Sequence, residues 1–413
     1  MAKRSDIPEF GLLSGVKVVH CTTSIAGPLA ASLFAEAGAD VIMLENAKTP
    51  CMSRNRFGGP CQQNAKNQRN LSLDIPSPEG KKVFLKLMEQ TDIFLEASKG
   101  GQYDKWGLSD EVLWEHNPRL VIVHISGFGQ TGVEEYVRRG SYDTIAQAFG
   151  CYMQLNGFPG QPPIPAMPQP VDHLCGVFAY GSGLAALRKA EKTGKGESID
   201  IAQYEIAMRC QNSFPVDFIN HNDIPKREGN HSAICCGYGL YPCKDGKSVY
   251  VMILGGGSLK RALPLLGLEF GSELYPADSS MIYPNTPAGD LFEERLTHFC
   301  LQKSAKEVEE VFLAHDVPCS MVMEYDDALN NPHYKAREVF KEWKKVDGKK
   351  FIGVNIFPKL KNYPGQIWRG APTVGMDNED ILAELGLTNS EIEELYRDRV
   401  IVQRDFKPGM KDK

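Results

Sequence analysis

Short apolar runs alternate with amphipathic segments through the first half of the chain. Strands buried on both faces are predicted at residues 16–20, 40–44, 92–96 and 120–126. Helices are predicted at residues 29–37, 79–90 and 109–116, where apolar residues recur at helical spacing. Strands that alternate with helices indicate a parallel sheet with helices on both faces. The predicted fold class is therefore α/β, with a doubly wound sheet.

The second half of the chain has a different pattern. Its composition turns polar at residues 219–229, which indicates a boundary, and we divide the chain into residues 1–225, 226–325 and 326–413. The middle part is expected to be a smaller α+β domain, with a turn at 241–246, a strand at 248–254 and helices at 291–300 and 305–315. The last part is expected to contain a helix from residue 326, a hairpin at 343–354 and helices at 379–385 and 390–396.

The composition is that of an ordinary globular protein. Of the 413 residues, 42% are hydrophobic and 24% are charged, which allows about two or three domains with well-buried cores. The formal net charge is -6 and the basic residues are dispersed, so no nucleic-acid partner is expected. The exception, the basic tail at residues 404–413, is interpreted as a solvated end.

Neither a signal peptide nor a membrane span is expected. Residues 1–11 mix Lys, Arg, Asp and Glu without an apolar run. No stretch approaches the roughly 18 apolar residues that a membrane helix needs. The 11 cysteines are irregularly placed, and the closest two, Cys235 and Cys236, are adjacent rather than in a CxxC motif. We therefore expect a cytoplasmic protein with reduced cysteines and no metal site.

Asp172 is the first candidate for a functional residue. It lies in the run Met167-Pro-Gln-Pro-Val-Asp-His-Leu-Cys-Gly176, between a proline-broken loop and a helix predicted at residues 176–190. A carboxylate at the entrance of a helix is commonly an N-cap, but it can also be a reactive group, and both interpretations are open here. Its neighbour His173 is interpreted as structural, because adjacent helical side chains point about 100° apart.

Two glycine-rich segments need separate interpretations. Gly127-Phe-Gly-Gln-Thr-Gly132 matches the GxGxxG pattern of dinucleotide-binding proteins. It follows a late strand and no apolar helix follows it, so NAD binding is disfavoured. The chain contains no GxxxxGK[ST] phosphate loop. Gly255, Gly256 and Gly257 follow a predicted strand and are either a plain turn or a mobile flap over a substrate.

A set of basic residues offers contacts for a polyphosphate. Lys99 comes just after the carboxyl end of a predicted strand, which is the edge where open α/β sheets bind ligands. The other members of the set are Lys66, Arg69, Lys105, Arg138 and Arg139. Such a set either binds a polyphosphate such as CoA or is solvated, and residue types alone do not separate these interpretations.

Several segments, spread over nearly the whole chain, resemble one family of enzymes. They are Ile25-Ala-Gly-Pro28, Gly38-Ala-Asp-Val-Ile42, Glu96-Ala-Ser-Lys-Gly100, Ser126-Gly-Phe-Gly129, Ile145-Ala-Gln-Ala148, Thr193-Gly-Lys-Gly-Glu-Ser-Ile-Asp200 and Pro364-Gly-Gln-Ile-Trp-Arg-Gly370. In this order they are similar to the class III (formyl-CoA, carnitine and bile-acid) CoA-transferases. Ile367-Trp-Arg-Gly370 followed by Gly375-Met-Asp377 is most similar to the carnitine and bile-acid branch.

The resemblance implies an architecture and a set of site residues. Members of the family are interlocked homodimers with a Rossmann-like large domain and a small domain, and their C-terminal segment returns to the large domain. By this resemblance Asp172 is the nucleophile and Lys99 contacts CoA. Gly255 to Gly257 would form the glycine flap of the formyl-CoA enzymes.

Two departures from the family pattern affect the expected CoA contacts. Trp106 stands where relatives have an arginine, with Lys105 beside it, and Gly140 stands near a lysine position, with Arg139 next to it. Lys105 and Arg69 are kept as candidates for CoA binding together with Lys99.

The chemistry implied by the resemblance fits these residue types. The Asp172 carboxylate would attack the thioester of an acyl-CoA, giving a mixed anhydride and CoA thiolate, and the thiolate would return to give an aspartyl-CoA thioester. A free carboxylic acid would then exchange in through a second anhydride. One thioester forms for each one broken, so no ATP is needed. CoA thioesters are substrates, and no permanently bound cofactor is expected.

Other functions are weighed against this one. α-Methylacyl-CoA racemases belong to the same superfamily and use a histidine near the stretch that here reads Gly140-Ser-Tyr-Asp143, which contains none. An NAD-dependent oxidoreductase rests only on the glycines from Gly127 to Gly132. A non-enzymatic protein would bind CoA without turnover.

The acceptor acid is open. A carnitine-like acid is our first expectation, followed by a bile acid and then a 2-hydroxy acid. A quaternary ammonium group favours aromatic faces, for which Tyr152, Tyr238 and Tyr241 are candidates by residue type alone. A steroid acid would need a wide apolar pocket.

Overall fold

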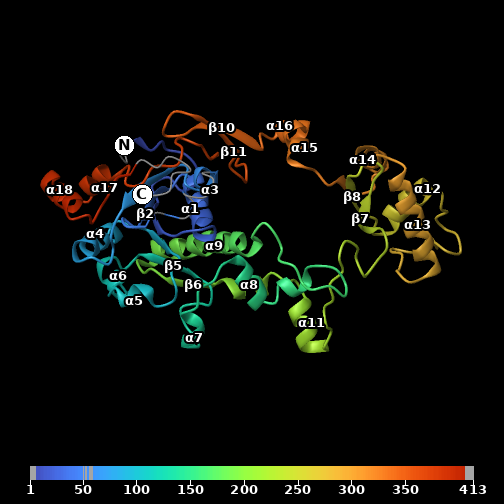
Figure 1. The fold of residues 1–413 in the computed structure, drawn as a ribbon, viewed down its shortest axis with the longest axis horizontal. Helices are drawn as coiled ribbons and strands as arrows, with labels where there is room; N and C mark the ends of the chain where they lie inside the picture. Colours follow the sequence, from blue (N-terminus) through green and yellow to red (C-terminus); the bar gives the residue numbers. More distant parts are fainter. Residues whose placement is uncertain (1–5, 50, 52–53, 55–58, 405–413) are drawn as a thin grey trace. The chain divides into compact units, whose positions relative to one another are not determined.

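The computed structural model describes residues 6–49, 51, 54 and 59–404 (Figure 1). Of the basic tail at residues 404–413, all but Arg404 lies outside the described residues. The chain divides into two compact units. The larger contains Met1–Tyr152, Pro165–Pro215 and Glu338–Lys413, and the smaller contains Met153–Ile164 and Val216–Arg337.

The larger unit is built around a six-stranded parallel sheet. Its order is β3-β2-β1-β4-β5-β6. The strands are β1 (Lys17–Cys21), β2 (Asp40–Glu45), β3 (Gln68–Ser72), β4 (Ile93–Glu96), β5 (Val121–Ser126) and β6 (Ser198–Ala202). The order runs outward from β1 in both directions, as in a Rossmann sheet, and places the topological switch point between β1 and β4. The predicted α/β doubly wound fold is confirmed.

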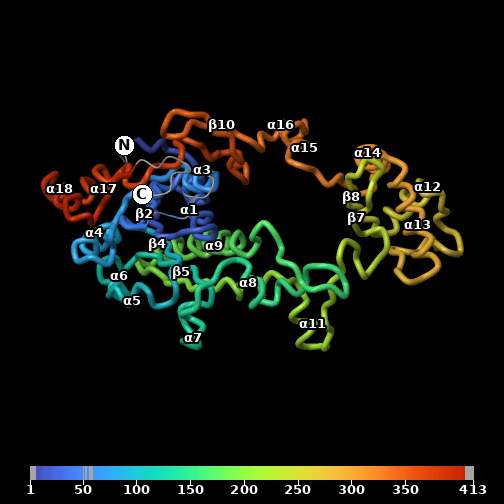
Figure 2. The backbone as a smooth tube through the Cα atoms, in the orientation of Figure 1, coloured from blue at the N-terminus to red at the C-terminus, as the bar shows by residue number. Residues whose placement is uncertain are grey.

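Helices cover both faces of this sheet. They are α1 (Ala26–Glu36), α4 (Pro78–Met88), α6 (Asp110–His116), α9 (Pro170–Thr193), α17 (Asn378–Glu384) and α18 (Asn389–Arg397). Successive strand residues point to opposite faces. Val19 therefore packs in a core with α4, α6, α17 and α18, whereas Val18 packs in a second core with α1 and α9. The ribbon in Figure 1 and the tube in Figure 2 both show α17 and α18 beside α4.

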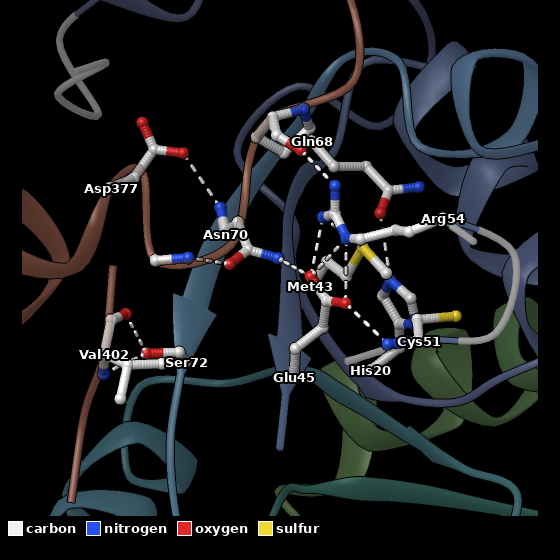
Figure 3. Close-up of polar contacts among 12 residues, drawn as sticks. His20, Met43, Glu45, Cys51, Arg54, Gln68, Asn70, Ser72, Asp377 and Val402 are labelled. Carbon is white, nitrogen blue, oxygen red and sulfur yellow. Dashed lines mark hydrogen bonds and ion pairs between the residues drawn. The ribbon is translucent and has the colours of Figure 1, made fainter. Parts of the chain in front are cut away.

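The apolar pattern misses the edge strand β3 because its sequence, Gln68-Arg-Asn-Leu-Ser72, is mostly polar although every residue in it is buried. The C-terminal segment supplies the polar partners (Figure 3). The backbone N–H of Asn70 donates to the Asp377 carboxylate at 2.8 Å, and Ser72 Oγ donates to the Val402 carbonyl at 2.5 Å. Partners so distant in the sequence leave no local signal.

A buried ion pair lies in the same region, at the carboxyl end of β2. Arg54 Nη2 lies 2.6 Å from Glu45 Oε2, and both side chains are buried (Figure 3). The Glu45 carboxylate also accepts hydrogen bonds from Asn70 Nδ2 at 2.6 Å and from the backbone N–H of Cys51 at 3.0 Å. Because Arg54 Nη1 donates to the Pro372 carbonyl, the cluster ties β2 and β3 to the C-terminal segment.

Short elements complete the larger unit. They are α3 (Gly59–Asn64), α5 (Gln102–Lys105), α7 (Glu134–Val137), α8 (Asp143–Phe149), α10 (Gln203–Arg209) and the hairpin of β10 (Phe340–Lys344) and β11 (Lys350–Val354). This hairpin is the one predicted at residues 343–354, and its first strand begins at Phe340. The edge strand β6 was not predicted, because its run Ser-Ile-Asp-Ile-Ala is short and half polar.

The smaller unit has its own core. An antiparallel sheet of β7 (Tyr238–Pro242), β8 (Ser248–Met252) and β9 (Cys319–Met321) packs with α12 (Gly256–Leu265), α13 (Pro287–Leu301) and α14 (Ala305–Ala314). Further short helices are α11 (Phe214–His221), α15 (Tyr325–Asn330), α16 (Pro332–Ala336) and the 3-10 turn η2 (Met153–Leu155). The predicted α+β character of this part is confirmed.

Two findings apply to all described residues. None of their helices combines the length and the apolar character needed to span a membrane. Nor do they contain a group of three or more His, Cys, Asp or Glu side chains placed to hold a metal ion.

Candidate active site

A pocket of about 210 Å³ opens at the carboxyl ends of β1, β4 and β5. Its walls include Ser24 after β1, Lys99 after β4 and Gly127 after β5, together with Asp172 and Gln203. This is the topological switch point of the sheet, where open α/β folds bind their ligands. The pocket therefore unites the edge predicted for ligand binding with the predicted nucleophile.

Asp172 lies in the first turn of α9, which begins at Pro170, earlier than the predicted start at Gly176. Gln169, in the left-handed conformation with φ 46°, is the N-cap, and no side-chain capping bond is formed there. The interpretation of Asp172 as an N-cap is therefore wrong. Its side chain instead lines the pocket and is only 4% exposed.

Glycines allow the elements around Asp172 to approach closely. A Cβ on Gly176, one turn further along α9, would lie 2.8 Å from the Ala26 carbonyl oxygen of α1. A Cβ on Gly127 would lie 2.2 Å from Cβ of Ser141, in a loop that also borders the pocket. Both distances are shorter than real Cβ atoms tolerate, so a side chain at either position would widen the site.

Among the described residues, one hydrogen-bond donor contacts the Asp172 carboxylate. Gln203 Nε2 donates to Asp172 Oδ1 at 2.5 Å. In the part of the chain that the structure describes, the other oxygen, Oδ2, accepts no hydrogen bond. No lysine or arginine forms an ion pair with Asp172 among these residues. The carboxylate is thus held at one oxygen and open at the other.

Burial, together with the nearby Asp143 carboxylate, raises the pKa of Asp172 to about 6, although His173 and Gln203 act in the opposite direction. Asp143 is itself buried, and its Oδ2 accepts the backbone N–H of Asp172 at 3.0 Å. Gln147 Nε2 donates to the other oxygen of Asp143. At neutral pH Asp172 is mostly ionised but more basic than an ordinary aspartate, which makes it the better nucleophile.

Comparison with known proteins identifies the family. The model of CoA-transferase family III matches residues 13–378. The chain belongs to this family. It is 39% identical over 405 residues to the bile acid CoA-transferase BaiK of Clostridium scindens, an alignment that covers 97% of this chain and 92% of the relative. The protein is therefore a class III CoA-transferase, and the resemblance seen in its sequence motifs is confirmed.

Solved structures agree with this assignment. A CAIB/BAIF family protein from Brucella suis superposes with a TM-score of 0.76 at 25% identity, covering 91% of this chain and all of that one. The Rv3272 protein of Mycobacterium tuberculosis also superposes with a TM-score of 0.76, at 20% identity, over 91% of this chain and 98% of its own. At this lower identity the second match supports the fold alone.

The basic residues expected to contact CoA in this transferase are only partly brought together. Lys99 and Arg139 both line the pocket, and the Lys99 side chain passes 3.6 Å from where a Cβ on Gly140 would lie. Arg138 joins these two in an open groove beside the pocket, with Phe128 and Phe149. Gly140, one of the departures from the family pattern, therefore lies beside the end of the Lys99 side chain.

Arg69, Lys66 and Lys105 lie elsewhere. Arg69 is buried in β3 and forms ion pairs at 2.8 Å with Asp40 and with Glu384 of α17. Lys66 is buried against Glu36 at 2.5 Å. Lys105 ends α5 and is not among the residues lining the pocket. The guanidinium of Arg69 and the ammonium of Lys66 therefore serve the fold, and we do not count them among CoA contacts.

The glycine segment lies in the smaller unit. Gly255, with φ 89°, is the N-cap of α12, and Gly256 and Gly257 form the first turn of that helix. The backbone N–H of Gly255 donates to the Ser280 carbonyl at 2.7 Å. The segment is thus a helix entrance, and its role as a flap stays a prediction.

Two residues of the site escape sequence reasoning. Gln203 follows β6, a strand that the apolar pattern misses, so its position at a carboxyl end is not recognised. Asp143 was noted only because its neighbourhood contains no histidine. Neither lies inside a segment that resembles the family, although Asp143 shortly precedes the segment Ile145–Ala148 and Gln203 shortly follows the segment Thr193–Asp200. The pocket walls likewise contain no histidine among the described residues, which counts against a racemase.

Proposed function

We propose that this class III CoA-transferase works through covalent catalysis by Asp172. The observation that carries the proposal is a buried carboxylate with a raised pKa, unpaired with any described cation, on the wall of the switch-point pocket. A structural aspartate in such a position would be destabilising without an ion-pair partner. We attribute this destabilising arrangement to the use of the carboxylate as a nucleophile.

The proposed reaction proceeds through two kinds of acyl intermediate. Asp172 Oδ2 attacks the thioester carbonyl of the donor, the C–S bond breaks, and a mixed anhydride and CoA thiolate result. The thiolate attacks Cγ of Asp172, the donor acid leaves, and an aspartyl-CoA thioester remains. The acceptor carboxylate attacks the same carbon and displaces the thiolate, which then attacks the acceptor's carbonyl and frees Asp172.

The pocket contributes binding and exclusion of water. Lys99 and Arg139 line both the pocket and the open groove beside it, where their charges can pair with the phosphates of CoA. The activated aspartate would be lost to hydrolysis if water reached it, and the near-complete burial of Asp172 limits that access. The first turn of α1, with Ala26 and Gly27 in the wall, adds backbone N–H groups for a developing oxyanion.

For the acceptor we propose a bile-acid-type carboxylic acid. The support is the 39% identity to a bile acid CoA-transferase over almost the whole chain. A carnitine-like acid, our first expectation from sequence, has less support. Its cation would meet Lys99 and Arg139 in the pocket, where Tyr142 is the one aromatic residue of the described walls. Tyr241 is buried, and its hydroxyl donates to Glu293 at 2.9 Å.

We also propose that the protein is a homodimer, as its family resemblance implies. Val177 and Phe178, on α9 one turn beyond Asp172, are 53% and 41% exposed. Apolar side chains on a central helix of the active site are typical of a surface that a partner covers. Light scattering after size-exclusion chromatography measures the mass directly, and a monomer would refute the proposal.

The function is tested by transfer assays with product detection by mass spectrometry. Wild type, Asp172→Ala and the exposed control His173→Ala are each given bile-acid, betainyl and short-chain acyl-CoAs with the matching free acids. We expect bile-acid transfer by wild type and His173→Ala, a covalent CoA adduct on the peptide containing Asp172, and neither in Asp172→Ala. Transfer by Asp172→Ala would refute the nucleophile, and exchange of an α-proton without transfer would favour a racemase.

A further inference from the structure

Gln203 is the residue in closest polar contact with Asp172. It is the first residue of α10, directly after β6, and α10 packs against α9. Its side chain is 7% exposed and lines the pocket. Because a carboxylate only accepts hydrogen bonds, the amide must present its NH₂ group to Asp172, as the 2.5 Å contact from Nε2 to Oδ1 requires.

We propose that Gln203 is a catalytic residue with two roles: it leaves Oδ2 of Asp172 as the attacking oxygen, and it stabilises the negative charge that develops on Oδ1 in the later steps. The proposal rests on the proposed nucleophilic role of Asp172. It assigns a separate function to each oxygen of that carboxylate and names the donor that separates them.

The first role follows from the geometry. A lone pair on Oδ1 is engaged by Nε2, whereas Oδ2 accepts no hydrogen bond from the described residues. An oxygen that accepts a hydrogen bond is a weaker nucleophile than one that accepts none. Attack through Oδ2 leaves Oδ1 as the carbonyl oxygen of both the anhydride and the aspartyl-CoA thioester, still in contact with the same amide.

The second role follows from the charge on Oδ1 along the reaction. In the free carboxylate Oδ1 shares one negative charge with Oδ2, and in the anhydride it is a neutral carbonyl oxygen. When the thiolate attacks Cγ, the electron pair of the C=O bond moves onto Oδ1, which then carries a full negative charge. Gln203 Nε2 already donates to this atom, and both side chains are buried, as suits an oxyanion donor.

A neutral amide suits these two roles better than a cation. A lysine or arginine at this distance would hold the carboxylate as an ion pair and lower its basicity strongly. Gln203 lowers the pKa of Asp172, but burial and Asp143 keep it at about 6. The hydrogen bond from Gln203 therefore orients the Asp172 carboxylate, while the pKa of Asp172 stays above that of an ordinary aspartate.

Loss of the donor has a specific chemical consequence. Formation of the anhydride does not need charge on Oδ1, so it continues, but return of the thiolate to Cγ is slowed. The anhydride then persists and water can attack it, giving the donor acid, free CoA and regenerated Asp172. Each such event consumes one acyl-CoA and one water and makes no new thioester. The enzyme is expected to shift from transferase toward thioesterase.

The test compares Gln203→Met, which has nearly the same shape but no donor, with Gln211→Met as the matched control. Gln211 lies just past the end of α10 and is equally buried, but its Nε2 donates to the carbonyls of Gly150 and Ala207 and does not contact Asp172. Donor acid, free CoA and acceptor-CoA are quantified together by mass spectrometry, which gives the ratio of hydrolysis to transfer.

We expect Gln203→Met to slow transfer on the order of 10²-fold and to raise the ratio of hydrolysis to transfer at least tenfold, as for loss of an oxyanion donor. Gln211→Met should keep the wild-type ratio even if it is less stable, because a purely structural defect lowers both products equally. If Gln203→Met does not fold, Gln203→Leu is measured in the same way.

An unchanged ratio in Gln203→Met or Gln203→Leu would overturn the role of Gln203. That result is distinguishable from failure of the proposed function. If the function itself is wrong, the covalent CoA adduct at Asp172 is missing from wild type. If only the Gln203 proposal is wrong, the adduct forms in both proteins at comparable rates.

Discussion

Replacing Asp172 by Asn should stabilise the folded protein, although it should abolish activity. The substitution keeps the shape of the side chain and an oxygen that can accept the hydrogen bond from Gln203. It removes a charge that is 4% exposed and lies beside the Asp143 carboxylate. A carboxylate in this environment opposes folding once it is ionised.

The magnitude and the pH range follow from the pKa of Asp172. Folding raises it from 3.8 to about 6, so between these values the folded state holds a proton that the unfolded state has lost. Wild-type stability therefore falls as the pH rises from about 4 to about 6. At 1.36 kcal/mol for each pKa unit the full penalty is about 3 kcal/mol, present above pH 6 and absent below about pH 4.

The measurement is the difference in urea unfolding free energy between Asp172→Asn and wild type at several pH values. We expect a difference near zero at about pH 4 that grows to about 3 kcal/mol in favour of the variant at about pH 7. Asp347→Asn is the control of opposite sign. Asp347 lies in the β10–β11 turn, and its pKa is lowered by the backbone N–H of Lys349 and by Lys345, so its ionised form helps folding.

A variant that is less stable than wild type at about pH 7 would refute this reasoning. So would a stability difference that does not change with pH, because the linkage between proton binding and folding requires one. Either result would mean that the carboxylate is solvated or paired in the native protein. The argument for an activated nucleophile would then lose its physical basis.

Two further predictions concern the surroundings of the site, and a third concerns a buried histidine of β5. Asp143→Asn keeps an acceptor for the Asp172 backbone N–H but removes the neighbouring charge that raises the pKa of Asp172. The acidic limb of the pH profile of kcat/KM should therefore move to lower pH. An unmoved limb would show that the two carboxylates are not coupled. Gly176→Ala should destabilise the protein by about 1–3 kcal/mol in urea unfolding and slow transfer, because its Cβ would lie 2.8 Å from the Ala26 carbonyl oxygen. Gly181→Ala on the same helix is the control, since its Cβ would meet nothing within 4 Å. Equal effects of the two substitutions would contradict the close packing of α1 on α9. His124 is buried between Glu96 at 2.7 Å and Asp110 at 3.0 Å. Burial opposes its charge, but these two partners raise the pKa of His124 to about 10. The charged imidazole therefore stabilises the fold fully below about pH 6.5, and this stabilisation is lost toward pH 10. Thermal unfolding of His124→Gln should accordingly show a loss of about 3–5 kcal/mol near neutral pH, and a loss that does not shrink toward pH 10 would argue against a charged imidazole.

Local pattern accounts for much of the fold. β1, β2, β4 and β5 lie close to the runs predicted for them, because strands buried on both faces are continuously apolar. The edge strand β3 could not be found in this way, since its residues are mostly polar and several of them pair with Asp377, Asn378 and Glu384 in the C-terminal segment. Contacts with residues distant in the sequence help to bury these polar side chains, so the local apolar pattern does not predict the strand.

The beginning of α9 shows a similar limit. The Gly/Ala-rich run predicted a helix from residue 176, but the helix starts at Pro170, a residue that is favourable in the first turn because it needs no N–H partner. The six additional residues turn Asp172 from a loop residue into a helical one. That change decides which way its side chain points, and thereby that it faces the pocket.

By itself the sequence determined the fold class, the family, the candidate nucleophile and the edge of the sheet where a ligand would bind, because each of these rests on apolar periodicity or on contiguous motifs. Only the tertiary structure decided which polar residues meet. Arg69, Lys66 and Lys99 are alike as residue types, yet the first two are neutralised by buried carboxylates and the third borders the pocket. Gln203 and Asp143 acquire their importance from lying beside Asp172. The reason is physical: burial and charge act through space over a few ångströms, whereas a sequence orders residues only along the chain.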